Sequence, residues 1–84
     1  MILRIDWSVR ARADLRSIDR ETAVAILHAL TRYARTGQGD VAALHGEFAG
    51  ALRLRVGDWR VRLRRLSPDH IQILRVHHRS AAYR

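Results

Sequence analysis

Arginine, histidine and tyrosine lie close together near the C-terminus, in the stretch "ILRVHHRSAAYR". Arg75, His77, Arg79 and Tyr83 fall in or just after an expected strand. Cleavage of a phosphodiester without a metal needs a group that accepts the 2′-hydroxyl proton, a group that protonates the leaving 5′-oxygen, and cations that stabilise the phosphorane. Arginine suits the last role, and histidine, with an ordinary pKa of about 6.5, suits either proton transfer. Tyrosine needs basic neighbours to lower its pKa of about 10 before it can act as a base.

A second group of arginines precedes this stretch, in "LRLRVGDWRVRLRR" at residues 52–65. Gly57-Asp58 predicts a two-residue turn between strands at residues 51–56 and 59–66. Alternate residues of a strand share a side, so the hairpin has one apolar and one basic side. The apolar side comprises Leu52, Leu54, Val56, Trp59, Val61 and Leu63. The basic side comprises Arg53, Arg55, Arg60, Arg62 and Arg64.

The predicted pairing places like charges opposite one another. Arg55 faces Arg60 and Arg53 faces Arg62, at a cost of roughly 0.2–1 kcal/mol per pair. Folding alone gives no reason for such a surface, whereas binding an anion does. Two interpretations remain open: an anion-binding surface, and a solvated surface whose repulsion is relieved by nearby Asp and Glu side chains.

The other residues that are able to do chemistry give weaker signals. His77 and His78 are adjacent on the expected strand and point to opposite sides, so one of them is expected to be structural. His28 and His45 are expected at the surface or in helix packing. The histidines form no i, i+4 pair and no carboxylate cluster accompanies them, so neither a metal site nor a cofactor is predicted. Both tryptophans are expected in the core.

A small α+β domain is expected to position these residues. Met1–Asp6 predicts a strand, and Ser8 and Asp19 are the expected N-caps of two helices. The second helix is expected to end near Gly37 and Gly39. The first helix is expected to align Trp7, Ala11, Leu15 and Ile18 on one face. The second is expected to align Ala23, Ile26, Leu27, Leu30 and Ala34.

The period of the apolar residues changes after the helices. Residues 40–46 are expected to be a connector that has room for a short turn of helix. The last strand is expected at residues 71–77, after a turn at residues 67–70 that contains proline. The expected order is β-α-α-β-β-β, a two-helix hairpin packed on an antiparallel sheet, in a single domain spanning residues 1–84.

The composition favours a polyanionic partner. The 84 residues carry sixteen arginines, no lysine and eight acidic residues, a net charge of +8. Nine of the arginines, but only two of the acids, lie in residues 51–84. The absence of cysteine excludes a disulfide framework, and no apolar run approaches the roughly 18 residues of a membrane span. Because the N-terminus also lacks a signal-like apolar region, a soluble cytoplasmic protein without a membrane partner is expected.

The chain resembles the RelE/ParE superfamily of toxins from bacterial toxin–antitoxin modules. The resemblance rests on "ALHGEFAGALRLRVGDWRVRLRR", which has a Leu-x-Gly connector followed by the arginine hairpin, and on "IQILRVHHRSAAYR", which closes in HR…Y. The early "WSVRARADLRSID" is similar to the family's first helix. RelE-like members are ribosome-dependent endoribonucleases that cut mRNA, whereas ParE-like members poison DNA gyrase. The ending resembles RelE-like tails more than ParE-like ones.

The RelE-like resemblance implies a compact α+β fold and an mRNA endoribonuclease that inhibits translation. The catalytic set that it implies is Arg60, Arg79, Tyr83 and Arg53. The RNA-binding set is Arg55, Arg62, Arg64 and His77. In this reading Arg60 and Arg79 hold the scissile phosphate and Tyr83 is the base, with His77 as the alternative proton-transfer group.

The resemblance also implies partners. These are the ribosome, mRNA and a cognate antitoxin whose acidic segment masks the basic groove, with a higher-order toxin–antitoxin complex as a further expectation. Two other functions stay open: a ParE-like gyrase inhibitor without nuclease activity, and a plain nucleic-acid-binding module.

Overall fold

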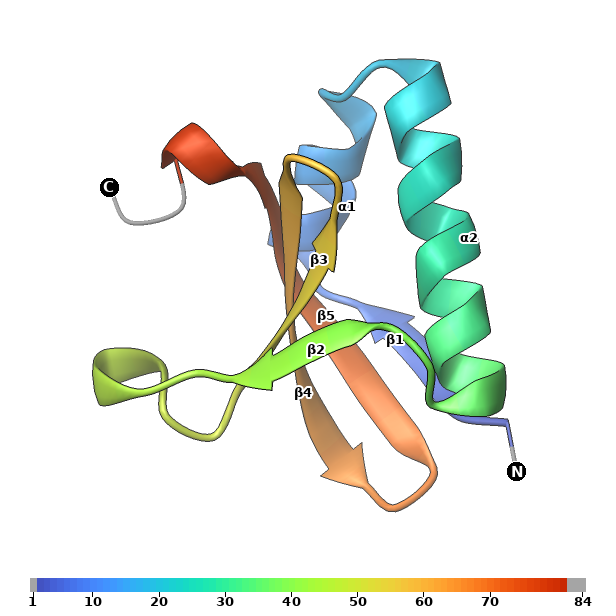
Figure 1. Ribbon diagram of the computed structural model, residues 1–84, viewed down its shortest axis with the longest axis vertical. Helices are drawn as coiled ribbons and strands as arrows, with labels where there is room; N and C mark the ends of the chain where they lie inside the picture. The colour runs from blue at the N-terminus through green and yellow to red at the C-terminus, as the bar shows by residue number, and fades with distance from the viewer. Residues whose placement is uncertain (1, 82–84) are drawn as a thin grey trace.

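The computed structural model describes residues 2–81, so Tyr83 lies outside the described residues. These residues form one five-stranded sheet, two α-helices and two short 3₁₀ turns (Figure 1). The elements are β1 (Arg4–Trp7), α1 (Val9–Arg16), α2 (Arg20–Thr36), β2 (Asp40–Ala43), η1 (Gly46–Phe48), β3 (Leu52–Val56), β4 (Trp59–Ser67), β5 (His70–His78) and η2 (Arg79–Ala81). The strand order in the sheet is β1-β5-β4-β3-β2.

The predicted two helices on a largely antiparallel sheet are confirmed, with two differences. Residues 40–46 were expected to be a connector, but Asp40–Ala43 forms β2, an edge strand antiparallel to β3. The expected turn of helix follows at Gly46–Phe48. The second difference is that β1 pairs with β5 in parallel rather than antiparallel orientation. Both differences concern edge strands, which are held mainly by backbone pairing with a distant segment.

The helix boundaries follow the capping residues. Ser8 Oγ accepts a hydrogen bond from the Ala11 N–H at 3.0 Å, and Asp19 Oδ2 accepts one from the Thr22 N–H at 3.0 Å. Each bond satisfies a donor that the first turn of a helix leaves without an intrahelical partner. Gly37 ends α2 with a φ of 75°, a left-handed conformation that glycine adopts without steric cost.

The core lies between α2 and the sheet. Leu54, Val61 and Leu63 of the hairpin are buried against α2, as the alternation predicted. The complete buried cluster is Ala11, Ile26, Leu30, Tyr33, Leu54, Val61, Leu63, Ile71, Ile73 and Val76. The α2 face is rotated slightly from the predicted one, since Leu27 is 40% exposed and Tyr33 is buried instead. Trp7 is also placed differently, because it ends β1 rather than beginning the apolar stripe of the first helix.

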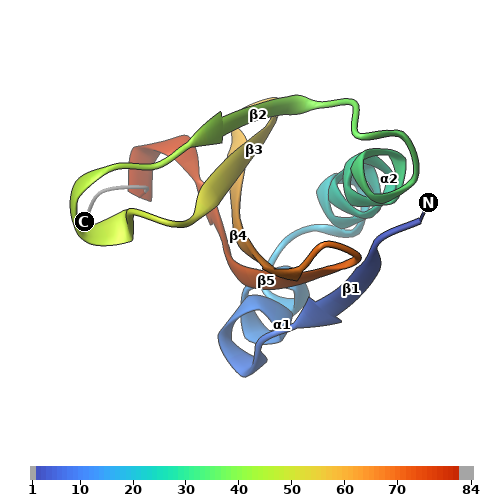
Figure 2. The same ribbon diagram turned by 90° about the horizontal axis from the view of Figure 1, so that it is seen from below.

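The sheet separates α2 from the segments on its other side. In both views α2 lies on one side of the strongly twisted sheet, whereas the η1 loop and η2 project from the other (Figures 1 and 2). The helix α1 lies beside β5, to which Asp14 of the helix and its N-cap residue Ser8 are hydrogen-bonded. No helix within residues 2–81 has the length and apolar character needed to cross a membrane.

Candidate nucleic-acid-binding site

The side of the sheet opposite α2 collects the arginines of the hairpin. The predicted register is confirmed: Arg55 pairs with Arg60 and Arg53 pairs with Arg62. Strand β5 extends each of these pairs into a row of three basic residues across the sheet, because His77 pairs with Arg60 and Arg75 pairs with Arg62. Paired residues of antiparallel strands share a side, so one continuous surface results. We call this surface the arginine face; it comprises Arg53, Arg55, Arg60, Arg62, Arg64, Arg75 and His77.

An irregularity in β5 brings Arg75 and His77 onto this face. Ile71 and Ile73 point into the core, and strict alternation would send Arg75 and His77 there as well. The register shifts between Arg62 and Leu63, so that Leu74 is an additional residue without an opposite partner. Such a bulge reverses the phase of the strand. Arg75 and His77 therefore lie on the arginine face.

Among residues 2–81, the carboxylates that form ion pairs with the arginine face lie at its margins. On β2, Asp40 Oδ2 is 2.6 Å from Arg55 Nε, and its other oxygen is 3.9 Å from Arg53. On α1, Asp14 pairs with Arg75 at 2.8 Å. Among residues 2–81, the central Arg60 and Arg62 have no ion pair. The structure therefore relieves the repulsion at both ends and leaves the centre of the face positively charged.

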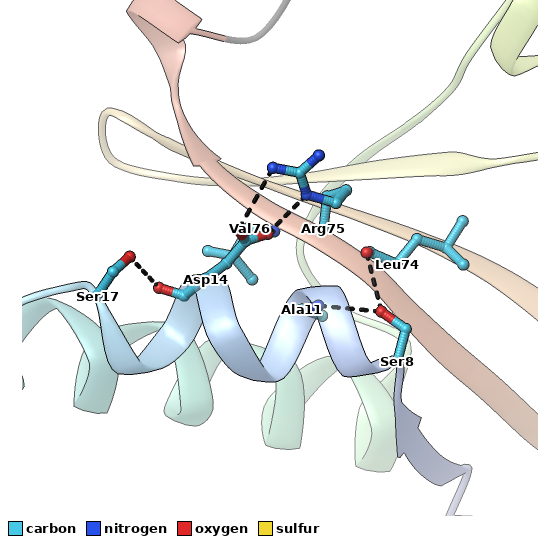
Figure 3. A network of polar contacts seen from close by, with 7 residues as sticks. All are labelled: Ser8, Ala11, Asp14, Ser17, Leu74, Arg75 and Val76. Carbon is cyan, nitrogen blue, oxygen red and sulfur yellow. Dashed lines mark hydrogen bonds and ion pairs between the residues drawn. The ribbon is translucent and has the colours of Figure 1, made fainter.

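A polar clasp joins α1 to the open edge of β5 (Figure 3). The carboxylate of Asp14 accepts hydrogen bonds from Arg75 Nε and from the Val76 N–H, both at 2.8 Å, and a longer one from Arg75 Nη2 at 3.4 Å. Ser8 Oγ donates to the Leu74 carbonyl at 3.0 Å. Because β1 ends opposite Ile73, these side chains replace the strand that would otherwise satisfy the backbone of β5.

The charge of Asp14 is stabilised by this clasp. Burial acts to raise the pKa of Asp14, but the hydrogen bonds from Arg75 and Val76 and the charges of Arg75 and His77 outweigh it and hold the pKa below its ordinary value. Asp14 was missed in the sequence. The sequence offers one indication of its role: Asp14 is the one acidic residue in an arginine-rich helix, three residues after the buried Ala11.

His77 is a half-buried imidazole on the arginine face. Burial lowers its pKa from 6.5, and the charges of Arg62 and Arg75 lower it further. His77 is therefore neutral near pH 7 and able to accept a proton. His78 lies on the other side of β5, where its ring meets that of Trp59 edge-on at 5.3 Å between centroids. The prediction that the two histidines point to opposite sides is borne out by these positions.

The remaining predicted residues lie at the hairpin turn or at the far end of β4. Arg60 Nη1 donates to the carbonyls of Gly57 and Trp59, both at 3.1 Å, so its guanidinium is anchored near the turn. Arg79 begins η2, where its backbone N–H donates to the Asp58 carbonyl at 2.8 Å. Arg64 lies at the opposite end of β4 and donates to Gln72 Oε1 at 3.2 Å. Arg79 is therefore next to the row of Arg60 but follows the strand rather than lying on it.

A hollow of about 460 Å³ opens beside the arginine face. Its lining consists of Arg10, residues 47–51, Arg62, Arg64, Leu74 and Arg75. Phe48 of η1 lies against Arg62, with the guanidinium carbon 4.2 Å from the centre of the ring. Sequence reasoning did not single out Phe48, since a lone aromatic residue in a connector carries no periodic signal.

Comparisons with known proteins identify the class to which this fold and surface belong. A family model described as the ParE toxin of the type II toxin–antitoxin system, parDE, matches residues 5–83. The search of curated proteins returns no significant match.

Solved structures of two RelE–RelB-type complexes and of YafQ have the same fold. The RelBE2 toxin–antitoxin complex from Mycobacterium tuberculosis matches with a TM-score of 0.82 at 25% identity, over 93% of this chain and 99% of that one. The archaeal RelE–RelB complex from Pyrococcus horikoshii matches with a TM-score of 0.76 at 23% identity, over 98% and 100%. The YafQ mutant H87Q from E. coli matches with a TM-score of 0.79 at 14% identity, over 98% and 99%.

The fold and the comparisons define a toxin of the RelE/ParE superfamily, as the sequence resemblance implied. The RelE-like leaning fits these structural neighbours. Within the superfamily, the chain belongs to the ParE toxin family of type II toxin–antitoxin systems.

Proposed function

We propose that this toxin is a ribosome-dependent endoribonuclease that cuts mRNA without a metal ion and so stops translation. The observation that carries the proposal is the position of His77, a half-buried imidazole in cross-strand register with Arg60, whose pKa is lowered by burial and by the charges of Arg62 and Arg75. A base beside several cations is the combination that transesterification of RNA requires. The similarity to solved RelE toxins supports the proposal, because the sequence resemblance implies endoribonuclease activity for RelE-like members.

The proposed reaction begins with the mRNA backbone lying across the arginine face. His77 accepts the proton of the 2′-hydroxyl, and the 2′-oxygen attacks the adjacent phosphorus. The guanidinium of Arg60, with Arg79 at the turn, stabilises the additional negative charge of the phosphorane. The bond from phosphorus to the 5′-oxygen then breaks, which leaves a 2′,3′-cyclic phosphate and a 5′-hydroxyl.

The leaving 5′-oxygen needs a proton. Tyr83 is the proposed donor, because a phenol with an ordinary pKa of about 10 is protonated at neutral pH. Since His77 is suited to the base role, this assignment exchanges the roles expected from the sequence for these two residues. Arg55, beside Arg60 in the same row, and Arg53, in the neighbouring row, supply positive potential, which Asp40 partly offsets.

A cognate antitoxin is the proposed regulatory partner. The RelBE2 and RelE–RelB structures are toxin–antitoxin complexes. The arginine face needs a partner with several carboxylates, because its central arginines have no ion pair among residues 2–81. An acidic segment of the antitoxin, bound across the face, would mask the site and occupy the position of the RNA phosphates.

Induced expression in a bacterium tests the proposal. We expect incorporation of labelled amino acids to stop while DNA synthesis continues at first, and new mRNA 5′ ends to appear within codons on the ribosome. His77→Gln should restore translation, whereas His28→Gln, at an exposed position on α2, should remain as toxic as the parent. If the His77 variant is as toxic as the parent, His77 is not the base of the reaction.

Inhibition of DNA gyrase is the second candidate, because the matching family model is that of ParE from parDE. The same expression experiment distinguishes the two. A gyrase inhibitor would arrest DNA synthesis and induce the DNA-damage response while mRNA stays intact and translation continues.

A further inference from the structure

The hollow beside the arginine face is outside the row that holds the proposed reaction. It is bounded by the first turn of α1, by the η1 loop and by the middle of β4 and β5. Arg62 and Arg60 are two residues apart on β4, so the hollow begins roughly 7 Å along the strand from the row of Arg60 and His77. A nucleotide bound there would be adjacent to the scissile phosphate.

The hollow contains a planar pair of side chains. The guanidinium of Arg62 lies 4.2 Å over the ring of Phe48. The η1 turn fixes the backbone around Phe48, since the Ala49 N–H donates to the Gly46 carbonyl and the Ala51 N–H donates to the Phe48 carbonyl, both at 3.1 Å. Aromatic rings and guanidinium planes are the surfaces on which the bases of single-stranded RNA stack.

The hollow also has an excess of positive charge, because its lining includes Arg10, Arg62, Arg64 and Arg75 against one carboxylate, that of Glu47. Burial lowers the pKa of Arg62, and the charges of Arg75 and Arg10 lower it further, whereas the carboxylates of Glu47 and Asp14 act in the opposite direction. Asp14 compensates Arg75, but within residues 2–81 neither Arg10 nor Arg62 has an ion pair. A phosphate between α1 and β4 would relieve this repulsion.

We propose that the hollow is a subsite for one nucleotide of single-stranded RNA, with its base stacked on the Phe48–Arg62 pair and its phosphate bound by Arg10. This inference rests on the proposed function. It places the nucleotide that is adjacent to the scissile phosphate in this hollow. Stacking depends on the presence of a base and little on which base it is. The subsite therefore contributes affinity and positions the RNA relative to the site of cleavage, with little sequence preference.

The test is binding of two uncleavable probes to the purified protein. One probe is a 2′-O-methyl uridine trinucleotide, and the other is the matching abasic chain with the same phosphates. We expect the parent to prefer the base-bearing probe by roughly tenfold, which is within the range measured for base stacking on aromatic residues. Phe48→Leu should reduce the preference to about twofold and leave binding of the abasic probe unchanged.

Two further variants separate stacking from charge. Arg62→Lys keeps the charge but loses the plane, so it should lose the preference for the base and keep the salt dependence of binding. Arg10→Gln should weaken both probes equally and reduce the slope of log affinity against log salt by roughly 0.7. Phe48→Trp keeps a ring and should keep the preference, which separates loss of stacking from a folding defect in Phe48→Leu.

The outcomes of this experiment are independent of cleavage. Thermal unfolding measurements first establish that Phe48→Leu and Arg62→Lys are folded. If both variants still prefer the base-bearing probe as the parent does, the proposed subsite is wrong, and the contact between Phe48 and Arg62 serves only to hold the η1 loop. The proposed nuclease activity would then still be tested by the expression experiment, independently of the subsite. If expression instead leaves mRNA intact while the base preference depends on Phe48, the subsite stands and the proposed function fails.

Discussion

The clasp between α1 and β5 predicts a large effect of a small substitution, Asp14→Asn. The change removes one negative charge from a side chain that is 18% exposed and accepts three hydrogen bonds. Bonds to charged groups contribute about 1.5–3 kcal/mol each, and the low end applies to the two 2.8 Å bonds because the pair is partly exposed, which gives about 3 kcal/mol in total. The amide keeps one neutral bond of about 0.5–1 kcal/mol. The amide NH2 group of asparagine also places N–H donors against the N–H donors of Arg75, which is unfavourable. We expect the free energy of unfolding to fall by about 2–3 kcal/mol.

The assay is denaturant and thermal unfolding of the purified protein at neutral pH. For a domain of this size the expected loss lowers the melting temperature by roughly 10–20 °C. Asp58→Asn is the matched control, since it removes the same charge from a carboxylate that is 65% exposed and lies 3.7 Å from Arg79, and it should change stability little. If both variants unfold with the same free energy as the parent, the clasp does not hold α1 on the sheet.

The clasp should also depend on pH. The pKa of Asp14 is held below 3.8 in the folded state, so its contribution is complete above the unfolded pKa and is lost as the pH falls through the folded one. The difference in stability between the parent and Asp14→Asn should therefore shrink in acid. A difference that stays constant down to the acid limit of the measurement would contradict the lowered pKa.

Three other predictions follow from the geometry. The unfolded chain binds a proton to His77 more readily than the folded chain does, so stability should fall as the pH drops below 6.5, and His77→Gln should flatten that slope in unfolding measured from pH 7.5 to 5. Gly39→Ala should lower the free energy of unfolding by about 1–3 kcal/mol, because its φ is 156° and the new Cβ would lie 2.9 Å from Leu54 Cδ1 in the core; denaturation equal to the parent's would contradict this. Asp40→Asn should strengthen binding of short RNA a few-fold by releasing Arg55, and weaker binding in a titration would show that this carboxylate orders the face instead.

The parts of the fold that depend on neighbouring residues could be predicted from the sequence. Gly57-Asp58 determines a two-residue turn, and the turn determines which hairpin residues share a side. Ser8, Asp19 and Gly37 have local capping roles that their side chains and conformations reveal. The basic surface was predictable for the same reason, because it follows from period two in the hairpin alone.

The parts that depend on distant pairing could not be predicted. Four residues at Asp40–Ala43 are too short to give a strand pattern, and they become β2 only because β3 offers its edge. The bulge at Leu74 has no turn residue to reveal it, although it decides that His77 faces the arginines. Asp14 acts on residues that are more than sixty positions away in the chain, so no local spacing indicates its role.

Cleavage of a defined mRNA on reconstituted ribosomes tests the central claim most directly. The parent should cut the mRNA, with a rate that falls as the pH drops below the lowered pKa of His77, and His77→Gln should slow cleavage by roughly 10²–10⁴-fold while His28→Gln does not. An intact mRNA, or a His77 variant that cuts as fast as the parent at every pH, would contradict the assignment of this face as a nuclease site.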